Sequence, residues 1–453
     1  MVNVSYDGNG QVAGLTLGAT PILQNIQYFP FAQAESWTWG NGQPHSRAFD
    51  QNGRLAAYPL GNRTRALAYD PASRITDYTD SDTSQSQHFE YDPLSRLLSA
   101  AINPTAALGA GQTLESFGYD FNGNRVSETV QTGATLLTSY GYSSTSNQLT
   151  QVAPQGSPAL IYSYDAAGNT LSDGRNSFTY GDRGRLTAAN TSQYAINGLG
   201  QRVQKNTPQG ITMFTYDDAG HLIGEYTSTG KPIRETIYLG DTPVAVITGG
   251  VVSYIHADHL NAPRAIVDAT GKTVWRWDSE PFGTGKPNED PDGDKKRFTY
   301  NLRFPGQYYD AETGLHYNYF RDYSPSLGRY LESDPIGLKG GINTFSYAAL
   351  NPAINIDKFG LDIRLYCGFV HCVYEVDTGN GVTRFGFGPW PKGGMQAIAI
   401  MASLLGPSIT LPGKIDENIG YAEVPSSSRL VTTWPLSNQR GDNYAKRLRS
   451  LSA

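Results

Sequence analysis

The sequence has few charged residues, only two cysteines and no long apolar segment. Charged residues make up 17% of the 453 positions, and the formal net charge is −6. This balance gives no electrostatic reason to expect a nucleic acid as the main partner. No apolar run approaches the roughly 20 residues that a membrane-spanning helix requires. Because Cys367 and Cys372 are the only cysteines, any disulfide would lie in the C-terminal tail.

Secretion signals are also lacking at the start of this sequence. Residues 1–7 have neither the basic start nor the apolar stretch of a secretory signal peptide. We therefore expect that any export uses another route, or that the chain is a fragment of a longer protein.

Glycine and tyrosine are abundant instead. The chain contains 50 glycines and 29 tyrosines, a composition that fits many short strands joined by tight turns. The composition also changes after Leu361. Residues 362–453 carry nine Lys and Arg against seven Asp and Glu, so this tail is mildly basic while the rest is acidic. The sequence therefore predicts two modules with separate roles.

An aromatic residue followed by Asp recurs through the first half of the chain. Steps of 20, 22 and 28 residues separate the first copies counted from Asp50, a period typical of stacked hairpins. In each copy, the aromatic residue would end a strand, Asp would begin a turn, and Gly would supply the positive φ. One hairpin cannot bury its own apolar face, so neighbouring copies must stack into a continuous sheet. The copies begin at Tyr6, Phe49, Tyr69, Tyr91, Tyr119, Tyr164 and Tyr216, with a degenerate copy at Tyr180.

These repeats resemble those of the Rhs/YD-repeat family of bacterial toxins and the related teneurins. Residues 254–260 with Arg264, and residues 303–323, are similar to the family's repeat-associated core, and the resemblance covers about residues 1–361. It implies a mainly β fold in which a hairpin ribbon spirals into a shell, a core plugs one end, and a toxin lies inside. We expect YD repeats in residues 1–245, the core in 246–361, and a variable small α+β toxin domain in 362–453. Family shells generally use more repeats, so this shell would be partial.

The resemblance also implies how such a protein is used. We expect an effector that is cytoplasmic before export and is then delivered by a type VI or toxin-complex system. A cognate immunity protein would be a partner, and no cofactor is expected. The target of the toxin does not follow from the sequence.

Two Asp-x-x-Gly-Leu elements, beginning at Asp334 and Asp357, suggest a pair of carboxylates that meet in space. Aspartic proteolysis needs two carboxylates that share one proton, so that one activates water and the other polarises the scissile carbonyl. The resemblance implies self-cleavage directly after the second element, between Leu361 and Asp362. Arg329 is a candidate for positioning a carboxylate or stabilising the oxyanion.

One residue departs from the family pattern, and one alternative stays open. Lys358 stands where the second element usually has proline, and an ammonium beside the carboxylates would favour their charged forms. Alternatively, both elements are turns that close the plug, with Asp as the turn initiator. The chain would then be a non-catalytic YD-repeat structural or cell-surface protein, or a decayed toxin cassette.

Two further clusters could bind metal but have simpler explanations. His256 and His259 flank Asp258, yet this spacing on a strand directs the two rings poorly toward one ion. A turn or core role is expected there. Residues 289–294 contain three aspartates in the style of a calcium loop, without the later bidentate Glu. We expect a solvated surface loop and no metal site.

The tail carries the least specific signals. Residues 363–366, 369–376 and 382–388 predict strands, 395–405 an apolar helix, and 443–451 a basic helix. A hairpin with His371 and Cys372 weakly resembles permuted papain-like toxin domains, but neighbouring strand residues point to opposite faces. The late helix, where that resemblance places the nucleophile, contains no Cys. Either the resemblance is false, the nucleophile is absent, or Cys372 serves instead. An enzymatic tail and a membrane-perturbing tail both remain possible from the sequence.

Overall fold

The computed structural model describes residues 1–29 and 34–361, and beyond them the backbone of three strands, 364–368, 371–377 and 382–387. The described chain is almost entirely β, as the sequence predicts. Every pair of strands in the sheets is antiparallel, and strand order follows chain order in each sheet. The helical turns among the described residues are short 3-10 turns: η1 (Thr83–Gln85), η2 (Gly337–Gly340) and η3 (Ala348–Leu350).

The ribbon begins with a five-stranded sheet and continues into two sheets of eleven strands each. The first sheet contains β1 (Val2–Tyr6), β2 (Val12–Leu17), β3 (Thr20–Tyr28), β4 (Ala34–Trp39) and β5 (Pro44–Ser46). The second contains β6 (Ala48–Phe49), β7 (Leu55–Leu60), β8 (Arg63–Tyr69), β9 (Ile75–Asp80), β10 (Gln87–Tyr91), β11 (Leu97–Ile102), β12 (Thr113–Tyr119), β13 (Arg125–Gln131), β14 (Thr135–Tyr142), β15 (Leu149–Pro154) and β16 (Leu160–Ile161). A short pair, β17 (Ser163–Tyr164) and β18 (Thr170–Ser172), leads to the second eleven-stranded sheet. That sheet contains β19 (Phe178–Tyr180), β20 (Leu186–Ala189), β21 (Ser192–Ile196), β22 (Arg202–Thr207), β23 (Gly210–Tyr216), β24 (Leu222–Thr227), β25 (Pro232–Leu239), β26 (Thr242–Thr248), β27 (Val251–Ala257), β28 (Pro263–Val267) and β29 (Thr273–Arg276).

Two small sheets follow the ribbon. The first contains β30 (Gln307–Asp310), β31 (Leu315–Asn318), β32 (Arg321–Ser324) and β33 (Arg329–Tyr330). The second contains β34 (Arg364–Gly368), β35 (His371–Asp377) and β36 (Val382–Phe387), so strands form where the sequence predicts them. The expected domain boundary at residue 245 falls inside β26, in the middle of the second eleven-stranded sheet. The ribbon has no break there.

Each repeat turn is built around one aspartate. In the copy at Asp70, Oδ1 accepts hydrogen bonds from the backbone N–H groups of Ala72 and Arg74, both at 2.9 Å. Oδ2 accepts from Arg74 Nε at 2.6 Å. The positive φ of 62° falls on Ser73, so the turn does not require glycine there. The same arrangement, with Arg, Asn or His four residues after Asp, occurs at Asp50, Asp92, Asp120, Asp165 and Asp217.

Side chains from one repeat reach the next. The Tyr91 hydroxyl donates to the carbonyl of Ile75 at 2.6 Å, and the Arg74 guanidinium lies 5.1 Å from the centroid of the Tyr91 ring. The hydroxyls of Tyr69, Tyr119 and Tyr216 reach back to the preceding repeat in the same way. Tyrosine and the residue four after Asp therefore join neighbouring hairpins, which accounts for the repeat signature physically.

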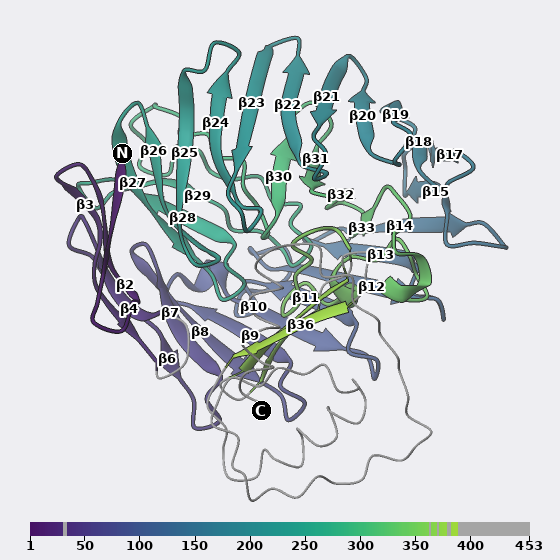
Figure 1. Ribbon diagram of the computed structural model, residues 1–453. Coiled ribbons are helices and arrows are strands. Elements are labelled where there is room, and N and C mark those ends of the chain that lie inside the picture. The colour runs from purple at the N-terminus through teal and green to yellow at the C-terminus, as the bar shows by residue number, and fades with distance from the viewer. Residues whose placement is uncertain (30–33, 362–363, 369–370, 378–381, 388–453) are drawn as a thin grey trace, which may run out of the picture.

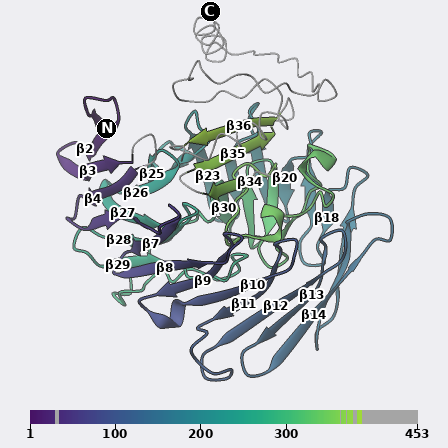
Figure 2. The same cartoon turned by 90° about the horizontal axis from the view of Figure 1, so that it is seen from below.

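The beginning of the ribbon packs against its later part. An apolar cluster joins residues of β2, β3 and β4 to residues of β26 and β27. Within it, Trp39 Nε1 donates to the carbonyl of Val244 at 3.2 Å. Figure 1 shows the resulting curved wall, with the two large sheets facing one another and β30–β33 between them, and Figure 2 shows it from below. The expected partial shell with an internal core is the observed architecture.

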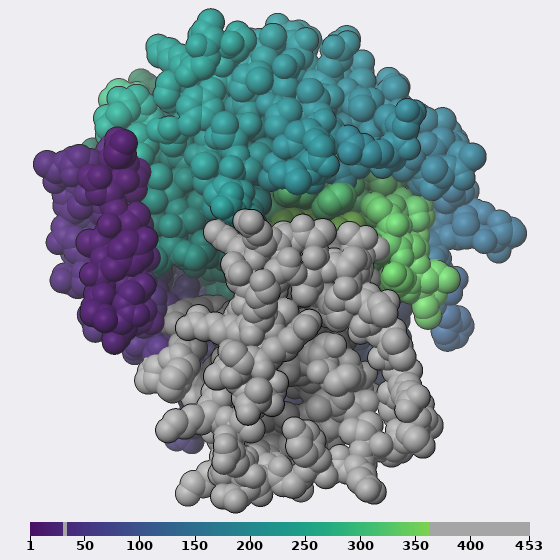
Figure 3. Space-filling model, in the orientation of Figure 1, coloured from purple at the N-terminus to yellow at the C-terminus, as the bar shows by residue number. Residues whose placement is uncertain are grey.

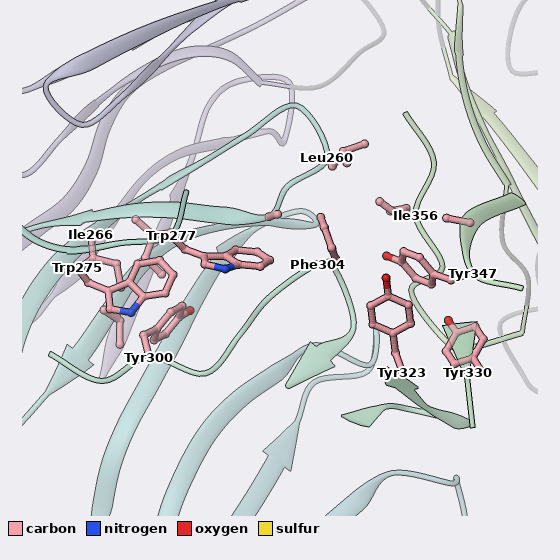
Figure 4. Packing of buried hydrophobic residues seen from close by; sticks show 14 residues of the cluster. Leu260, Ile266, Trp275, Trp277, Tyr300, Phe304, Tyr323, Tyr330, Tyr347 and Ile356 are labelled. Atoms are coloured by element: carbon pink, nitrogen blue, oxygen red, sulfur yellow. The ribbon is translucent and has the colours of Figure 1, made fainter. Parts of the chain in front are cut away.

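The buried apolar residues include many aromatic rings. The largest hydrophobic cluster contains Trp275, Trp277, Tyr300, Phe304 and Tyr323, each no more than 2% exposed. Figure 4 shows how these side chains bridge from the last shell strands to residues 304–356. In the space-filling view of Figure 3, residues after 300 appear beneath the arch of the shell. Burial of many large rings here fixes the segments that carry the two Asp-x-x-Gly-Leu elements.

Candidate active site

The two aspartates that the sequence singles out meet at one arginine. A guanidinium nitrogen of Arg321 lies 2.9 Å from Asp334 Oδ2 and 3.1 Å from Asp357 Oδ2. Both carboxylates are buried, with residue exposures of 5% for Asp334 and 0% for Asp357. The predicted convergence of the two elements is therefore present in the structure.

Arg321 also binds the backbone of the second element and of a residue that pairs with the first. Its Nε donates to the carbonyl of Gly360 at 2.6 Å, and another guanidinium nitrogen donates to the carbonyl of Thr344 at 3.1 Å. The Thr344 carbonyl also accepts the N–H of Asp334 at 2.8 Å. The guanidinium lies 3.7 Å from the centroid of the Tyr330 ring. One side chain on β32 thus connects two chain segments that are far apart in sequence.

Asp357 accepts hydrogen bonds from a tyrosine, an arginine and a backbone N–H. Oδ2 accepts from the Tyr330 hydroxyl at 2.7 Å as well as from Arg321, and Oδ1 accepts from the N–H of Leu361 at 3.0 Å. Asn318 Nδ2 donates to the Tyr330 hydroxyl at 2.7 Å and to the carbonyl of Asp357 at 2.8 Å. Burial, together with the nearby Asp357 charge, raises the pKa of Tyr330 well above its usual value, so this hydroxyl keeps its proton. The carboxylate directly faces the residue that precedes the expected cleavage site.

The turn interpretation of the two elements is also realised. Asp334 Oδ1 accepts from the N–H of Ile336 at 2.9 Å, just as Asp357 Oδ1 accepts from Leu361. Each aspartate therefore uses one oxygen to fix its own turn and directs the other toward Arg321. Initiating a turn and contributing to a carboxylate pair are compatible roles.

Glycine is required in the second element. Gly360 has φ +67°, and a Cβ at this position would lie 2.5 Å from the carbonyl oxygen of Asn318. Any side chain there would displace the element from Asn318 and Arg321. In the first element, Gly337 has φ +62° but open space around its Cβ position.

Arg329 lies away from the carboxylates. One of its guanidinium nitrogens donates to the carbonyl of Asn147 at 2.7 Å, and the group lies 4.7 Å from the centroid of the Phe345 ring. Neighbouring residues of a strand point to opposite faces, and Tyr330, the next residue on β33, faces Asp357. Arg329 therefore does not lie beside the two carboxylates, as the sequence led us to expect. Arg321 lies there instead. The sequence offered one signal for Arg321, its place inside the core segment 303–323.

Lys358 does not direct its ammonium toward the pair. The Nζ atom lies 2.6 Å from Asp241 Oδ1 and 3.0 Å from His221 Nε2. The expectation that this ammonium would act on the two carboxylates is thus replaced by an ion pair with the shell.

The other predicted clusters have structural roles where they are described. Asp258 accepts the N–H groups of Leu260 and Ala262, both at 2.9 Å, and pairs with Arg264 Nε at 2.7 Å. His259 contacts the Tyr58 and Tyr78 hydroxyls and the carbonyl of Ala353, while the His256 ring packs 3.9 Å from the ring of Trp39. The turn and core roles expected for residues 256–259 agree with these contacts.

The acidic loop brings its three aspartates together. One ligand atom from each of Asp290, Asp292 and Asp294 lies within 4.8 Å of the others. Asp290 Oδ2 and Asp294 Oδ1 accept backbone N–H groups of Lys295 and Lys296 at 3.2 and 2.7 Å. The loop is an acidic turn in which Asp290 and Asp292 are half-buried and Asp294 is exposed.

Several predicted positions lie outside the described residues, among them Asp362 and the helices expected at 395–405 and 443–451. His371 and Cys372 are consecutive residues of β35, and the description there is limited to the backbone. Within the described part of the chain, no helix is long and apolar enough to cross a membrane.

Comparison with known proteins identifies the family of this chain. The family model of the teneurin YD-shell matches residues 64–344, which is more than half of the sequence. The chain belongs to the teneurin YD-shell family. The resemblance of the repeats to Rhs/YD-repeat proteins is confirmed.

Several relatives of this YD shell are named as toxins. It is 29% identical over 345 residues to double-stranded DNA deaminase toxin A of Burkholderia cenocepacia, covering 66% of this chain and 22% of that protein. It is 37% identical over 114 residues to toxin protein Tse5 of Pseudomonas aeruginosa, covering 25% of this chain and 8% of that protein. The chain therefore spans less than a quarter of either relative.

The fold is that of solved toxin structures. The Photorhabdus luminescens Tc holotoxin pore matches with a TM-score of 0.64 at 19% identity, over 85% of this chain and 21% of that chain. The complex of TcdB2 with TccC3 matches with a TM-score of 0.63. At this level of identity the likeness concerns the shell fold alone.

Proposed function

We propose that this YD shell is part of an Rhs-type toxin carrier that encloses its C-terminal segment and cuts the chain after Leu361. The observation that carries this proposal is the convergence of Asp334 and Asp357 on Arg321, with Asp357 hydrogen-bonded to Leu361. The toxin names of the relatives support the carrier role. Delivery machinery of the type VI or toxin-complex kind and a cognate immunity protein are the partners of such a carrier, in competition between bacteria or against a host.

The charge balance of the buried site fits acid–base hydrolysis. Two carboxylates and one guanidinium leave one negative charge, which a single proton neutralises. One carboxylate of the pair then acts as the base that activates water, and the other as the acid that polarises the Leu361 carbonyl.

The reaction balances as an ordinary peptide hydrolysis. Water adds its hydroxyl to the carbonyl carbon of Leu361 and gives one proton to the carboxylate that acts as the base. The carbon–nitrogen bond to residue 362 then breaks, and that carboxyl group passes the proton to the leaving nitrogen. The products are a carboxylate at Leu361 and a free amine at Asp362.

The test combines native and denaturing separation of the purified chain. The proposal predicts that the wild type migrates as one particle under native conditions and separates into residues 1–361 and 362–453 when denatured. Asp357→Asn should stay a single chain under both conditions. Asp258→Asn is the matched control, because Asp258 is also a buried turn aspartate paired with an arginine. An uncut wild type would instead support the structural YD-repeat protein or the decayed cassette.

A further inference from the structure

Each Asp-x-x-Gly-Leu element is held by a different turn of the shell. Near the first element, the N–H and Oγ1 of Thr170 donate to the carbonyl of Leu331 at 3.2 and 2.6 Å. At the second element, the turn between β23 and β24 packs on the chain. There, a Cβ at Gly220 would lie 3.1 Å from the Phe359 ring. The carboxylate pair is thus assembled from two segments anchored to separate repeats.

Lys358 makes the charged contact between the second element and the shell. Its side chain is 8% exposed, and its Nζ lies 2.6 Å from Asp241 Oδ1 and 3.0 Å from His221 Nε2. Asp241 follows β25, while His221 belongs to the preceding repeat turn. The ammonium therefore joins Asp357's own segment to two separate turns of the ribbon.

The contacts of His221 orient its ring toward Asp241 and Lys358. His221 occupies the position four residues after the repeat aspartate, where other copies have Arg or Asn. Its Nδ1 lies 2.7 Å from Asp217 Oδ2, its Nε2 lies 2.7 Å from Asp241 Oδ1, and its ring stacks 4.5 Å from the Tyr238 ring. Burial alone would raise the pKa of Asp241, but His221 and Lys358 lower it below its usual value. Asp241 therefore stays negative beside the ammonium.

The backbone of Lys358 is fixed at its other end by the core. A Cβ at Gly306 would lie 1.8 Å from the carbonyl oxygen of Lys358, so glycine allows this close approach. The Lys358 carbonyl thus packs closely on the core, while its ammonium pairs with the shell. Because Asp357 is the preceding residue, its orientation depends on both contacts.

We infer that Lys358 is a positioning residue for Asp357, and that its ion pair with Asp241 couples self-cleavage to correct seating of the core in the shell. This inference rests on the proposed self-cleavage. In a chain whose ribbon is not wound far enough to place Asp241 against the core, Lys358 lacks its ion pair, Asp357 is less firmly oriented, and cleavage is slow. Cleavage then reports that the shell has formed around the segment to be released.

The experiment follows the fraction of cut chain with time during cell-free synthesis. Lys358→Met removes the ammonium and keeps the apolar stem, and it should slow cleavage by about tenfold or more, the effect of displacing a reacting group. Lys358→Arg keeps the charge and should restore cleavage to within about threefold of the wild type. Asp241→Asn should slow cleavage as much as Lys358→Met does. If Lys358→Met does not fold, the cleavage rate of Asp241→Asn tests the inference in its place.

A matched control separates positioning from stability. Lys205 is another buried lysine, 2.9 Å from Asp310 and 3.3 Å from Glu312, and it does not touch the pair. Melting temperatures are measured with Asp334→Asn added, so that every chain stays whole. Slower cleavage in Lys358→Met than in Lys205→Met at equal loss of melting temperature supports the inference. Equal slowing in both, or wild-type rates in Lys358→Met, overturns it. An uncut wild type would sink the proposed function and this inference with it.

Discussion

Asp334 and Asp357 each direct one carboxylate oxygen to the same nitrogen of Arg321 and the other oxygen to a backbone N–H of their own turn. This divided use explains why the same short element can close a loop and contribute to a reactive pair. It also makes the pair sensitive to the residues that orient it, and these are open to substitution.

Arg321 is the first of these residues. Arg321→Met should abolish cleavage and lower the free energy of unfolding by about 3–5 kcal/mol, because two buried carboxylates lose their shared partner. Arg329→Met should leave the cleavage rate close to that of the wild type, since Arg329 binds Asn147 instead. Time courses of cleavage and urea unfolding check both. The reverse order of effects would restore Arg329 to the site.

Tyr330 donates to Asp357 and should matter for rate more than for stability. Tyr330→Phe removes one hydrogen bond, which is worth about 1 kcal/mol of stability, and should slow cleavage by roughly tenfold. Tyr323→Phe is the control, because the buried Tyr323 hydroxyl donates to the carbonyl of Phe282 at 2.8 Å. Its loss should cost similar stability and leave the rate unchanged. Equal rates in the two variants would contradict a role for the Tyr330 hydroxyl.

The glycines of the two elements should differ in their tolerance of a side chain. Gly360→Ala adds a methyl group 2.5 Å from the Asn318 carbonyl and should prevent cleavage. Gly337→Ala meets no atom within 4 Å and should cost only the strain of a positive φ, about 1 kcal/mol. Intact masses of both variants measure the difference. A fully cut Gly360→Ala chain would show that the second element does not need the observed geometry.

A second pair of buried acids predicts how stability changes with pH. Burial raises the pKa of Glu332 to about 8 and, despite the Arg202 charge, raises that of Asp322 to about 7. The folded state therefore holds a proton that the unfolded state releases at lower pH. The stabilisation is present in acid and is lost as the pH rises from about 5 to 8.

The melting temperature should accordingly fall across this window, and Glu332→Gln should flatten the slope. The measurement is thermal unfolding at several pH values with Asp334→Asn added to keep the chain whole. A melting temperature that rises between about pH 5 and pH 8 would argue against buried acids that keep a proton in the folded state.

The sequence predicted the shell well because its repeats are local. The aspartate, the positive φ and the aromatic residue of each copy lie within a few residues, so turn chemistry alone locates the hairpins. The link between repeats was harder to see. That Tyr91 reaches the carbonyl of Ile75, for example, depends on how two hairpins stack.

The candidate site was predicted only in part, because some of its residues are marked by a local motif and others are not. Asp334 and Asp357 stood out through their shared element, whereas Arg321 and Tyr330 come from two other strands. Which arginine faces the pair depends on strand alternation, and Arg329 points away because Tyr330 points in. The position of the Lys358 ammonium could not be predicted, since Asp241 and His221 reach it only through the winding of the shell.

The most direct test of the account is the intact mass of the purified wild-type chain beside Asp334→Asn, Asp357→Asn and the control Asp258→Asn. The account predicts two fragments for the wild type and the control, with a new amino terminus at Asp362, and one whole chain for each variant of the pair. A whole wild-type chain, or cleavage that survives in either Asp334→Asn or Asp357→Asn, would contradict the claim that these two carboxylates cut the bond after Leu361.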